Sequence, residues 1–216
     1  MTLTAMIVKM SQGLGRTCGI FFLTLLFSLP LGLLVALLRM SKRRLVSGVM
    51  QAAISVLRGT PLMLQLIAVS YGPFYLFGHT LLVKQKLLAI ILAFSLNYAA
   101  YFAEIYRGGI ESMPVGQYEA AHVLGYSKRQ TFMRIILPQV IKRILPSVTN
   151  EVITLVKDTS LAFTLAYMEM FTIGKQIANA KSSFMPFVIA GVFYYLMNMV
   201  VAFAMSRLEK ALGYYR

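Results

Sequence analysis

Residues 119–138 read EAAHVLGYSKRQTFMRIILP, a polar and basic stretch in a chain that is otherwise strongly apolar. The preceding run from 115 to 123 is rich in helix-forming residues, and Gly125 then offers a position at which a helix can stop. A second helical run is predicted over 128–137, and Pro138 is expected to close it because proline cannot continue a helix. Two short helices rimmed with charge predict a rigid protrusion, whereas the alternative is a solvated connector.

The composition of the whole chain predicts a membrane protein. It has 216 residues, of which 58% are hydrophobic, and a mean hydropathy of +0.72. A water-soluble domain cannot cover that much apolar surface, so a lipid bilayer is the expected solvent. The net charge is +14, but the Lys and Arg residues lie between apolar runs, where they indicate membrane topology and not a nucleic-acid-binding face.

The apolar segments predict a single all-α, polytopic transmembrane domain over residues 1–216. A straight membrane helix needs ~20 apolar residues. The expected spans are 17–38, 46–77, 87–103 (continued by residues 104–106), 144–171 and 182–206. The second is broken by the sequence RGTP at 58–61, and the fourth carries Glu151, Lys157 and Asp158. We therefore expect about five transmembrane helices, two of them irregular.

The distribution of Lys and Arg predicts the orientation, because these residues accumulate in short cytoplasmic loops. Four follow the first span, six lie between the third and fourth, and three follow the last, so 13 of the 21 share one side. Six lie on the other side, and Arg58 and Lys157 lie within spans. This distribution predicts an N-terminus outside, a C-terminus inside and a cytoplasmic loop over about residues 108–143.

Polar residues inside the spans are candidates for a substrate pathway, because intramembrane charges usually face protein or water. Ser147, Glu151, Thr154 and Asp158 recur at helical spacing and predict one polar face on the fourth span. For Asp158 the alternative is a structural pairing with Lys157, Arg58 or a helix end.

Two further groups of polar residues add candidates on other spans. Asn97, Tyr101 and Glu104 form a second polar face, although Glu104 is better explained by pairing with Arg107 three residues on. A break in a membrane helix frees backbone groups, which are tolerated only beside protein or a cavity. Thr60 and Gln65 are therefore secondary candidates for lining the pathway.

The loop contains a recognisable pattern. Glu119-Ala120-Ala121, three residues, Gly125, nine residues and then Ile135-x-Leu137-Pro138 resembles the EAA loop of ABC importer permeases. Three other stretches are similar to the polar amino acid uptake branch of that family, and they read RGTPLMLQL at 58–66, LNYAAYFAEIYRGGIESMPVGQYEAA at 96–121 and NEVITLVKDTSL at 150–161. The resemblance implies the fold of a type I ABC importer permease.

The resemblance also implies that the loop is a coupling helix seated in a groove of a separate ATP-hydrolysing subunit. The small side chains of Ala120 and Ala121 suit a close approach to a partner, and Glu119 supplies a charge for a basic residue of the groove. Gly125 permits a turn that a Cβ atom would obstruct. Ile135, Leu137 and Pro138 complete the pattern.

The function implied is that of a permease subunit in an ATP-binding-cassette importer of a polar L-amino acid (basic, glutamine-like or cystine), in the bacterial cytoplasmic membrane. It would work by alternating access as a homodimer or heterodimer, served by an extracytoplasmic substrate-binding protein. An ion-coupled secondary transporter of small polar solutes is one alternative, and a sensor or scaffold that uses the loop to bind a kinase or assembly factor is another.

The chain itself is not expected to be an enzyme. It contains no G-x-x-x-x-G-K-[ST] phosphate loop, so ATP and Mg²⁺ are expected in the partner ATPase and no cofactor is expected in this chain. The lone Cys18 argues against a thiol–metal site or a disulfide framework. His79 and His122 are too far apart to suggest a metal pair, and no nucleophilic triad is recognisable.

Overall fold

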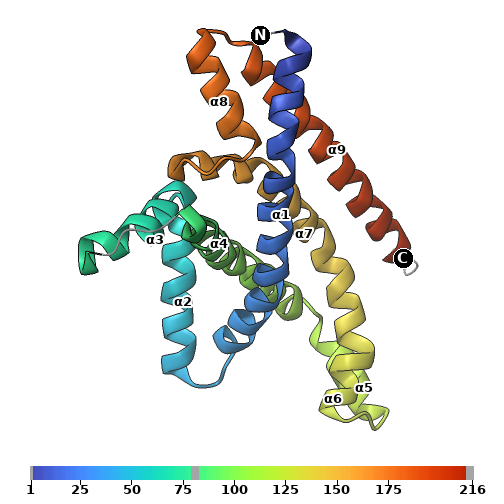
Figure 1. Ribbon diagram of the computed structural model, residues 1–216. Coiled ribbons are helices and arrows are strands. Elements are labelled where there is room, and N and C mark those ends of the chain that lie inside the picture. The colour runs from blue at the N-terminus through green and yellow to red at the C-terminus, as the bar shows by residue number, and fades with distance from the viewer. Residues whose placement is uncertain (1, 79–82, 213–216) are drawn as a thin grey trace.

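The computed structural model describes residues 2–78 and 83–212, and this part of the chain is helical (Figure 1). The first half consists of α1 (Leu3–Arg39), α2 (Arg44–Gly59), α3 (Leu62–Phe77) and α4 (Val83–Glu111). The loop region holds α5 (Val115–Val123), α6 (Lys128–Gln130) and a π-helical segment, Thr131–Ile136. The rest consists of α7 (Leu137–Asp158), a 3₁₀ segment (Thr159–Leu165), α8 (Met170–Lys181) and α9 (Met185–Leu212).

The membrane-spanning elements agree in part with the predicted five spans. Among the described helices, α1, residues 85–111 of α4, and α9 are long and apolar enough to cross a bilayer, and α2 with α3 form a fourth, bent candidate. The bend of 106° lies at the predicted break. The predicted fourth span, 144–171, was wrong in its bounds, because α7 ends at Asp158 and a 3₁₀ segment and a separate helix, α8, follow.

Helix α1 forms the axis of the molecule, and its most extensive contact is with α4 (Figure 1). The aromatic side chains of Phe94, Tyr98 and Phe102 on α4 are almost completely buried in the core between these helices. Gly32 allows the backbones to approach, because a Cβ at this position would lie 2.8 Å from the Cβ of Phe102. The aromatic packing therefore fixes α1 against α4.

The two ends of the molecule carry different elements. Figure 1 shows α5 and α6 at the lower end of α7, whereas the N-terminus and α8 lie at the opposite end. The α1–α2 turn also lies toward the lower end, so the two most basic loops of the described chain share one side. This arrangement agrees with the predicted sidedness, which stays a prediction.

The first turn of α8 is held by a buried carboxylate. Glu169 is completely buried and accepts hydrogen bonds from the backbone N–H groups of Phe171 (2.7 Å) and Thr172 (2.6 Å). The remaining N–H, that of Met170, donates to the Thr17 hydroxyl of α1 at 3.2 Å. Since three of the N–H groups that a helix start leaves unpaired are satisfied here, α8 can begin in the protein interior.

Gly13 on α1 faces this helix start, and its replacement tests the packing. A Cβ at Gly13 would lie 2.7 Å from both the N and the Cα of Met170, which are backbone atoms and cannot move aside cheaply. We expect Gly13→Ala to lower the free energy of unfolding by about 1–3 kcal/mol, as overpacking does. Thermal unfolding of the detergent-solubilised protein would measure this.

Gly15→Ala is the matched control, because it lies on the same helix and a Cβ there would meet no atom within 4 Å. It is expected to be neutral or to stabilise the helix by up to ~1 kcal/mol. Equal unfolding temperatures for the two variants would contradict the packing of α1 on α8.

Candidate functional site

The tip of the loop is a well-defined helix end. Helix α5 has the predicted bounds, and Gly125 after it adopts a left-handed conformation with φ of 78°. The N–H of Gly125 donates to the carbonyl of His122 at 2.9 Å, and the N–H of Tyr126 donates to that of Ala121 at 3.0 Å. This is the Schellman pattern of a glycine-terminated helix, so the predicted stop at Gly125 is confirmed.

The two alanines of the pattern face different ways. Ala121 is 1% exposed, and α5 packs against the π-helical segment, so the small side chain of Ala121 serves packing within this chain. Glu119 and Ala120 are exposed. Beside them, Val123 is 86% and Leu124 73% exposed, which is unusual for apolar side chains at the tip of a polar loop.

The predicted end of the second helix at Pro138 was wrong, because the helix continues through it. Pro138 stands in the first turn of α7, where proline is tolerated, and a π-helical segment precedes it. The N–H of Leu137 bonds five residues back to Phe132, and the Gln139 side-chain amide donates to the carbonyl of Ile135 at 2.8 Å. The change of helical register therefore falls at the proline, and Ile135 and Leu137 are half-buried beside it.

The break between α2 and α3 is closed by side-chain amides. Pro61 has no N–H, so the carbonyl of Leu57, four residues earlier, loses its helical partner. Gln65 Nε2 and Asn97 Nδ2 both donate to this carbonyl, at 2.8 and 3.0 Å. Asn97 also donates to Gln65 Oε1 at 3.1 Å, and Gln65 donates to Thr60 Oγ1 at 2.9 Å.

The structure thus brings together three predicted pathway residues, Thr60, Gln65 and Asn97, and gives each a hydrogen bond in this network. Asn97 is also buried, with 5% of its surface exposed. The network accounts for these side chains without a ligand, and their contact with substrate stays a prediction.

The polar face of α7 is present over part of its predicted length. Glu151, Thr154 and Asp158 are all half-buried, whereas Ser147 is exposed. Asp158 accepts a hydrogen bond of 2.7 Å from the phenol of Tyr98 on α4. The predicted structural pairing of Asp158 with Lys157, Arg58 or a helix end is therefore not the one found. The sequence alone does not show which of the many tyrosines of this chain reaches a given carboxylate.

The charged residues near this face divide into paired and unpaired groups. Glu104 forms the predicted ion pair with Arg107, with 2.6 Å between Oε2 and Nη2. Arg107 also pairs with Glu111. Arg58, by contrast, lies over the ring of Tyr101, with its Cζ 5.0 Å from the ring centroid. Helix α4 therefore contacts both regions, because its Tyr101 packs against Arg58 at the break and its Tyr98 bonds Asp158 on α7.

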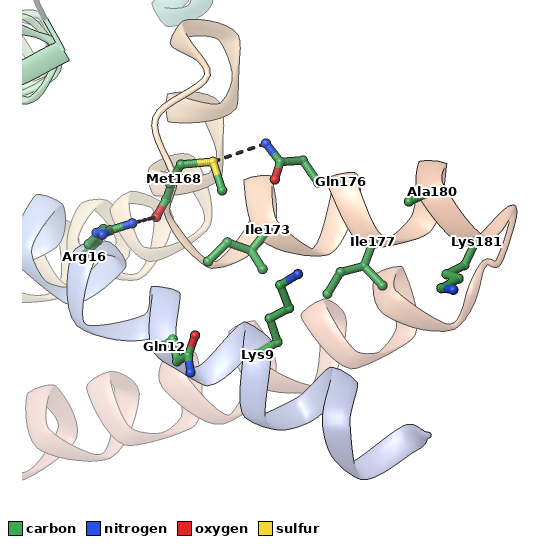
Figure 2. A pocket seen from close by; sticks show the side chains of 9 residues that line it. All are labelled: Lys9, Gln12, Arg16, Met168, Ile173, Gln176, Ile177, Ala180 and Lys181. Carbon is green, nitrogen blue, oxygen red and sulfur yellow. Dashed lines mark hydrogen bonds between the residues drawn. The ribbon is translucent and has the colours of Figure 1, made fainter. Parts of the chain in front are cut away.

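A cleft of about 480 Å³ lies elsewhere, between the N-terminal part of α1 and α8 (Figure 2). Its floor includes Ile173 and Ile177, and Lys9, Arg16 and Lys181 contribute cations. The Arg16 guanidinium donates to the carbonyl of Met168 at 2.8 Å. No predicted pathway residue lines this cleft, so it is distinct from the α7 face.

Glu169 was missed by the sequence reasoning. A weak signal was present, because an acid directly before a helix with Thr172 three residues later is typical of a capped start. Nothing in the sequence indicated that Thr17 of α1 would lie against it.

Comparisons with known proteins identify the family of this chain. A family described as the binding-protein-dependent transport system inner membrane component matches residues 28–214. The nopaline transport system permease protein of Agrobacterium fabrum is 36% identical over 201 residues, covering 90% of this chain and 83% of that protein. The L-cystine transport system permease protein of Bacillus subtilis is 34% identical over 208 residues, covering 95% and 87%.

Solved structures give the same result. An amino acid ABC transporter with histidines matches with a TM-score of 0.85 at 30% identity, covering 96% of this chain and 94% of that one. The MetNI methionine ABC transporter shares the fold, with a TM-score of 0.75 at 19% identity over 98% and 99% of the chains. On these matches, the chain belongs to the family of binding-protein-dependent transport system inner membrane components.

Proposed function

We propose that this chain is the permease subunit of an ATP-binding-cassette importer of a polar L-amino acid. The observation that carries this proposal is the combination of family membership with relatives named as permeases for nopaline, L-cystine and arginine. All of these solutes carry amino and carboxylate groups. Family membership disfavours the alternatives of an ion-coupled transporter and of a sensor or scaffold.

The loop tip supports a separate ATPase as partner. Glu119, Ala120, Val123 and Leu124 leave a small mixed surface exposed on a rigid helix, and the Gly125 turn fixes its end. Exposed apolar side chains rimmed by charge suit contact with another protein. ATP and Mg²⁺ belong to that partner, and ATP binding would move α5 and turn the permease between its inward- and outward-facing states.

A single bundle of this size cannot enclose a polar pathway and also engage two ATPase subunits. We therefore propose a pair of permease chains, either identical or different, in the bacterial cytoplasmic membrane, with an extracytoplasmic binding protein that delivers the substrate. The polar face of Glu151, Thr154 and Asp158 supports the pathway, since a half-buried carboxylate in a span needs water, a cation or a ligand.

Substitutions in the loop tip test the coupling role. We expect Glu119→Ala and Gly125→Val to abolish uptake while the protein still inserts in the membrane. Glu119 is exposed, and valine at Gly125 is incompatible with φ of 78°. Uptake of radiolabelled L-arginine, L-glutamine and L-cystine into proteoliposomes holding the full importer measures this.

Gly116→Ala is the matched control for Gly125→Val, because Gly116 lies in α5 and a Cβ there would meet no atom within 4 Å. It is expected to transport normally. Normal uptake in Gly125→Val with the ATPase still bound would rule out the coupling role of the tip.

Removing the charge of Glu151 tests the pathway. We expect Glu151→Gln to weaken transport more than assembly or basal ATPase activity, because a charge-assisted hydrogen bond to a substrate cation contributes roughly 1.5–3 kcal/mol. The apparent affinity should fall roughly tenfold to a hundredfold, measured as uptake kinetics. Ser147→Ala is the control, because Ser147 is exposed on the same helix, and it should leave the uptake kinetics unchanged. Unchanged uptake kinetics in Glu151→Gln would show that Glu151 has a structural role.

The orientation is tested by cysteine labelling in a Cys18→Ser background. A cysteine replacing Thr4 should react with an impermeant maleimide added to intact cells, whereas one replacing Lys128 or Arg216 should react only after the membrane is opened. Arg216 lies outside the described residues, and Lys128 is exposed beside α5. Labelling at Lys128→Cys in intact cells would show that the predicted orientation is reversed.

A further inference from the structure

The cleft between α1 and α8 is positively charged. Of the nine residues that line it, Lys9, Arg16 and Lys181 are cationic and none is acidic. All three of these side chains are exposed. Figure 2 shows Arg16 toward one end of the cleft and Lys181 at the other, with Lys9 between them. An anion in the cleft would therefore be attracted along its whole length.

The described part of this chain does not neutralise these charges. None of Lys9, Arg16 and Lys181 forms an ion pair there. The two lysines also form no hydrogen bond with a described residue, whereas Arg16 donates one of its N–H groups to the carbonyl of Met168 at 2.8 Å. The carboxylate of Glu169, beside Met168, is completely buried and accepts hydrogen bonds from the first turn of α8. The cleft therefore keeps an uncompensated positive charge.

The floor of the cleft is apolar and closely packed. Ile173 and Ile177 of α8 are 7% and 5% exposed and belong to a hydrophobic cluster that includes Met10 of α1. Gly174 lets the two helices approach, because a Cβ at this position would lie 2.8 Å from the Cε of Met10. The close packing of α1 on α8 thus holds a cationic rim above an apolar floor.

The position of the cleft along the helices is that of a membrane boundary. Helix α1 has 37 residues, more than the ~20 that cross a bilayer, and its charge-free run begins directly after Arg16. The charge-free run that contains most of α9 begins directly after Lys181. Since both residues line the cleft, the sequence predicts that it lies where the helices leave the hydrocarbon and enter the headgroup layer. This placement holds for either orientation of the chain.

An anionic phospholipid matches these properties better than other anions do. A volume of about 480 Å³ suits a small group, whereas a protein partner typically covers ~800 Å² of surface. A soluble anion such as phosphate would use the cations and leave the apolar floor unused. A phospholipid supplies a phosphate for the rim and glycerol and acyl groups for the floor, and the headgroup layer holds it at this depth.

We propose that this cleft binds the headgroup of an anionic phospholipid. Lys9 and Lys181 bind the phosphate, and the floor of Ile173 and Ile177 contacts the glycerol and the upper part of the acyl chains. Arg16, held by the Met168 carbonyl, adds charge at the other end of the cleft. The site is separate from the polar face of α7 and from the loop tip, so it does not depend on which solute the importer carries. The bound lipid would join α8 to α1 and stabilise this end of the permease.

The test measures how lipids stabilise the purified permease–ATPase complex in a non-ionic detergent. Its unfolding temperature is followed while dioleoylphosphatidylglycerol, dioleoylphosphatidylcholine or inorganic phosphate is added. Phosphatidylglycerol should raise the unfolding temperature of the wild type in a saturable way, because a ligand of the native state stabilises it. Phosphatidylcholine has no net charge and phosphate has no acyl chains, so each should need a concentration about tenfold higher or more. Added salt should weaken the effect of phosphatidylglycerol.

Variants locate the effect at the cleft. Lys9→Gln and Lys181→Gln should each lower the apparent affinity for phosphatidylglycerol about fivefold, and the double variant about twenty-five-fold, because each removes one charge from the headgroup site. Lys9→Arg keeps the charge and should keep the affinity. Lys175→Gln is the matched control, since Lys175 lies on α8 but does not line the cleft, and its ammonium lies 4.2 Å from the centroid of the Phe163 ring. It should leave the affinity for the lipid unchanged.

Equal affinity for phosphatidylglycerol in the wild type and the double variant would show that the lipid binds elsewhere and would overturn the assignment. Stabilisation by inorganic phosphate as strong as that by phosphatidylglycerol, and lost in the double variant, would make a soluble anion the occupant and would also overturn it. If neither probe stabilises the wild type, both occupants are excluded. Substrate uptake by the same preparations reports separately on the proposed function.

Discussion

Backbone N–H and C=O groups inside a bilayer have no water to bind, so each interruption of a helix there needs hydrogen-bonding partners from the protein itself. This chain interrupts its helices within its apolar part between α2 and α3 and before α8, and side chains meet the requirement in both places. Gln65 and Asn97 bond the carbonyl that Pro61 leaves without a partner. Glu169 caps the start of α8. In the loop region, Gln139 similarly bonds a carbonyl at the change of helical register.

The same requirement decides which polar residues are free to act on a substrate. A side chain that closes a break can bind a substrate only if the backbone carbonyl or N–H that it releases finds another partner. Leaving such a buried group unpaired costs ~1–3 kcal/mol. Asn97 and Gln65 are committed in this way, and Asp158 is bonded to Tyr98. The side chains of Arg58 and Glu151, by contrast, form no hydrogen bond with any described residue. Polar residues of the apolar part therefore divide into those that close the structure and those that do not.

The sequence predicted those features that depend on local chemistry. The bounds of α5 and the stop at Gly125 follow from helix propensity and from the one residue type that adopts a left-handed conformation without strain, and both are confirmed. The break after Arg58 follows from the fixed geometry of Pro61, and the Glu104–Arg107 pair follows from a spacing of one helical turn.

The predictions that failed depended on a local change of helix type or on contacts between distant segments. Pro138 was expected to end a helix, but a preceding π-helical segment moves the change of register onto the residue that lacks an N–H. The region 144–171 was read as one span because apolar periodicity does not reveal that Glu169 and Thr17, 152 residues apart, meet to start a new helix. Likewise, the partner of Asp158 is a tyrosine 60 residues away.

The continuity of the chain through Pro138 has a mechanical consequence for the proposed importer. Had the helix ended there, the loop tip and the polar face would belong to separate bodies joined by a flexible turn. Instead, the π-helical segment and α7 are continuous, and Glu151 lies 14 residues after Leu137, or ~21 Å along the helix at 1.5 Å per residue, with Pro146 inside this stretch. Helix α5 packs against this segment and buries Ala121, so it is attached to the start of the continuous helix. In the proposed importer, a displacement of α5 by a partner would therefore act directly on the start of α7, the helix that carries the polar face of Glu151, Thr154 and Asp158.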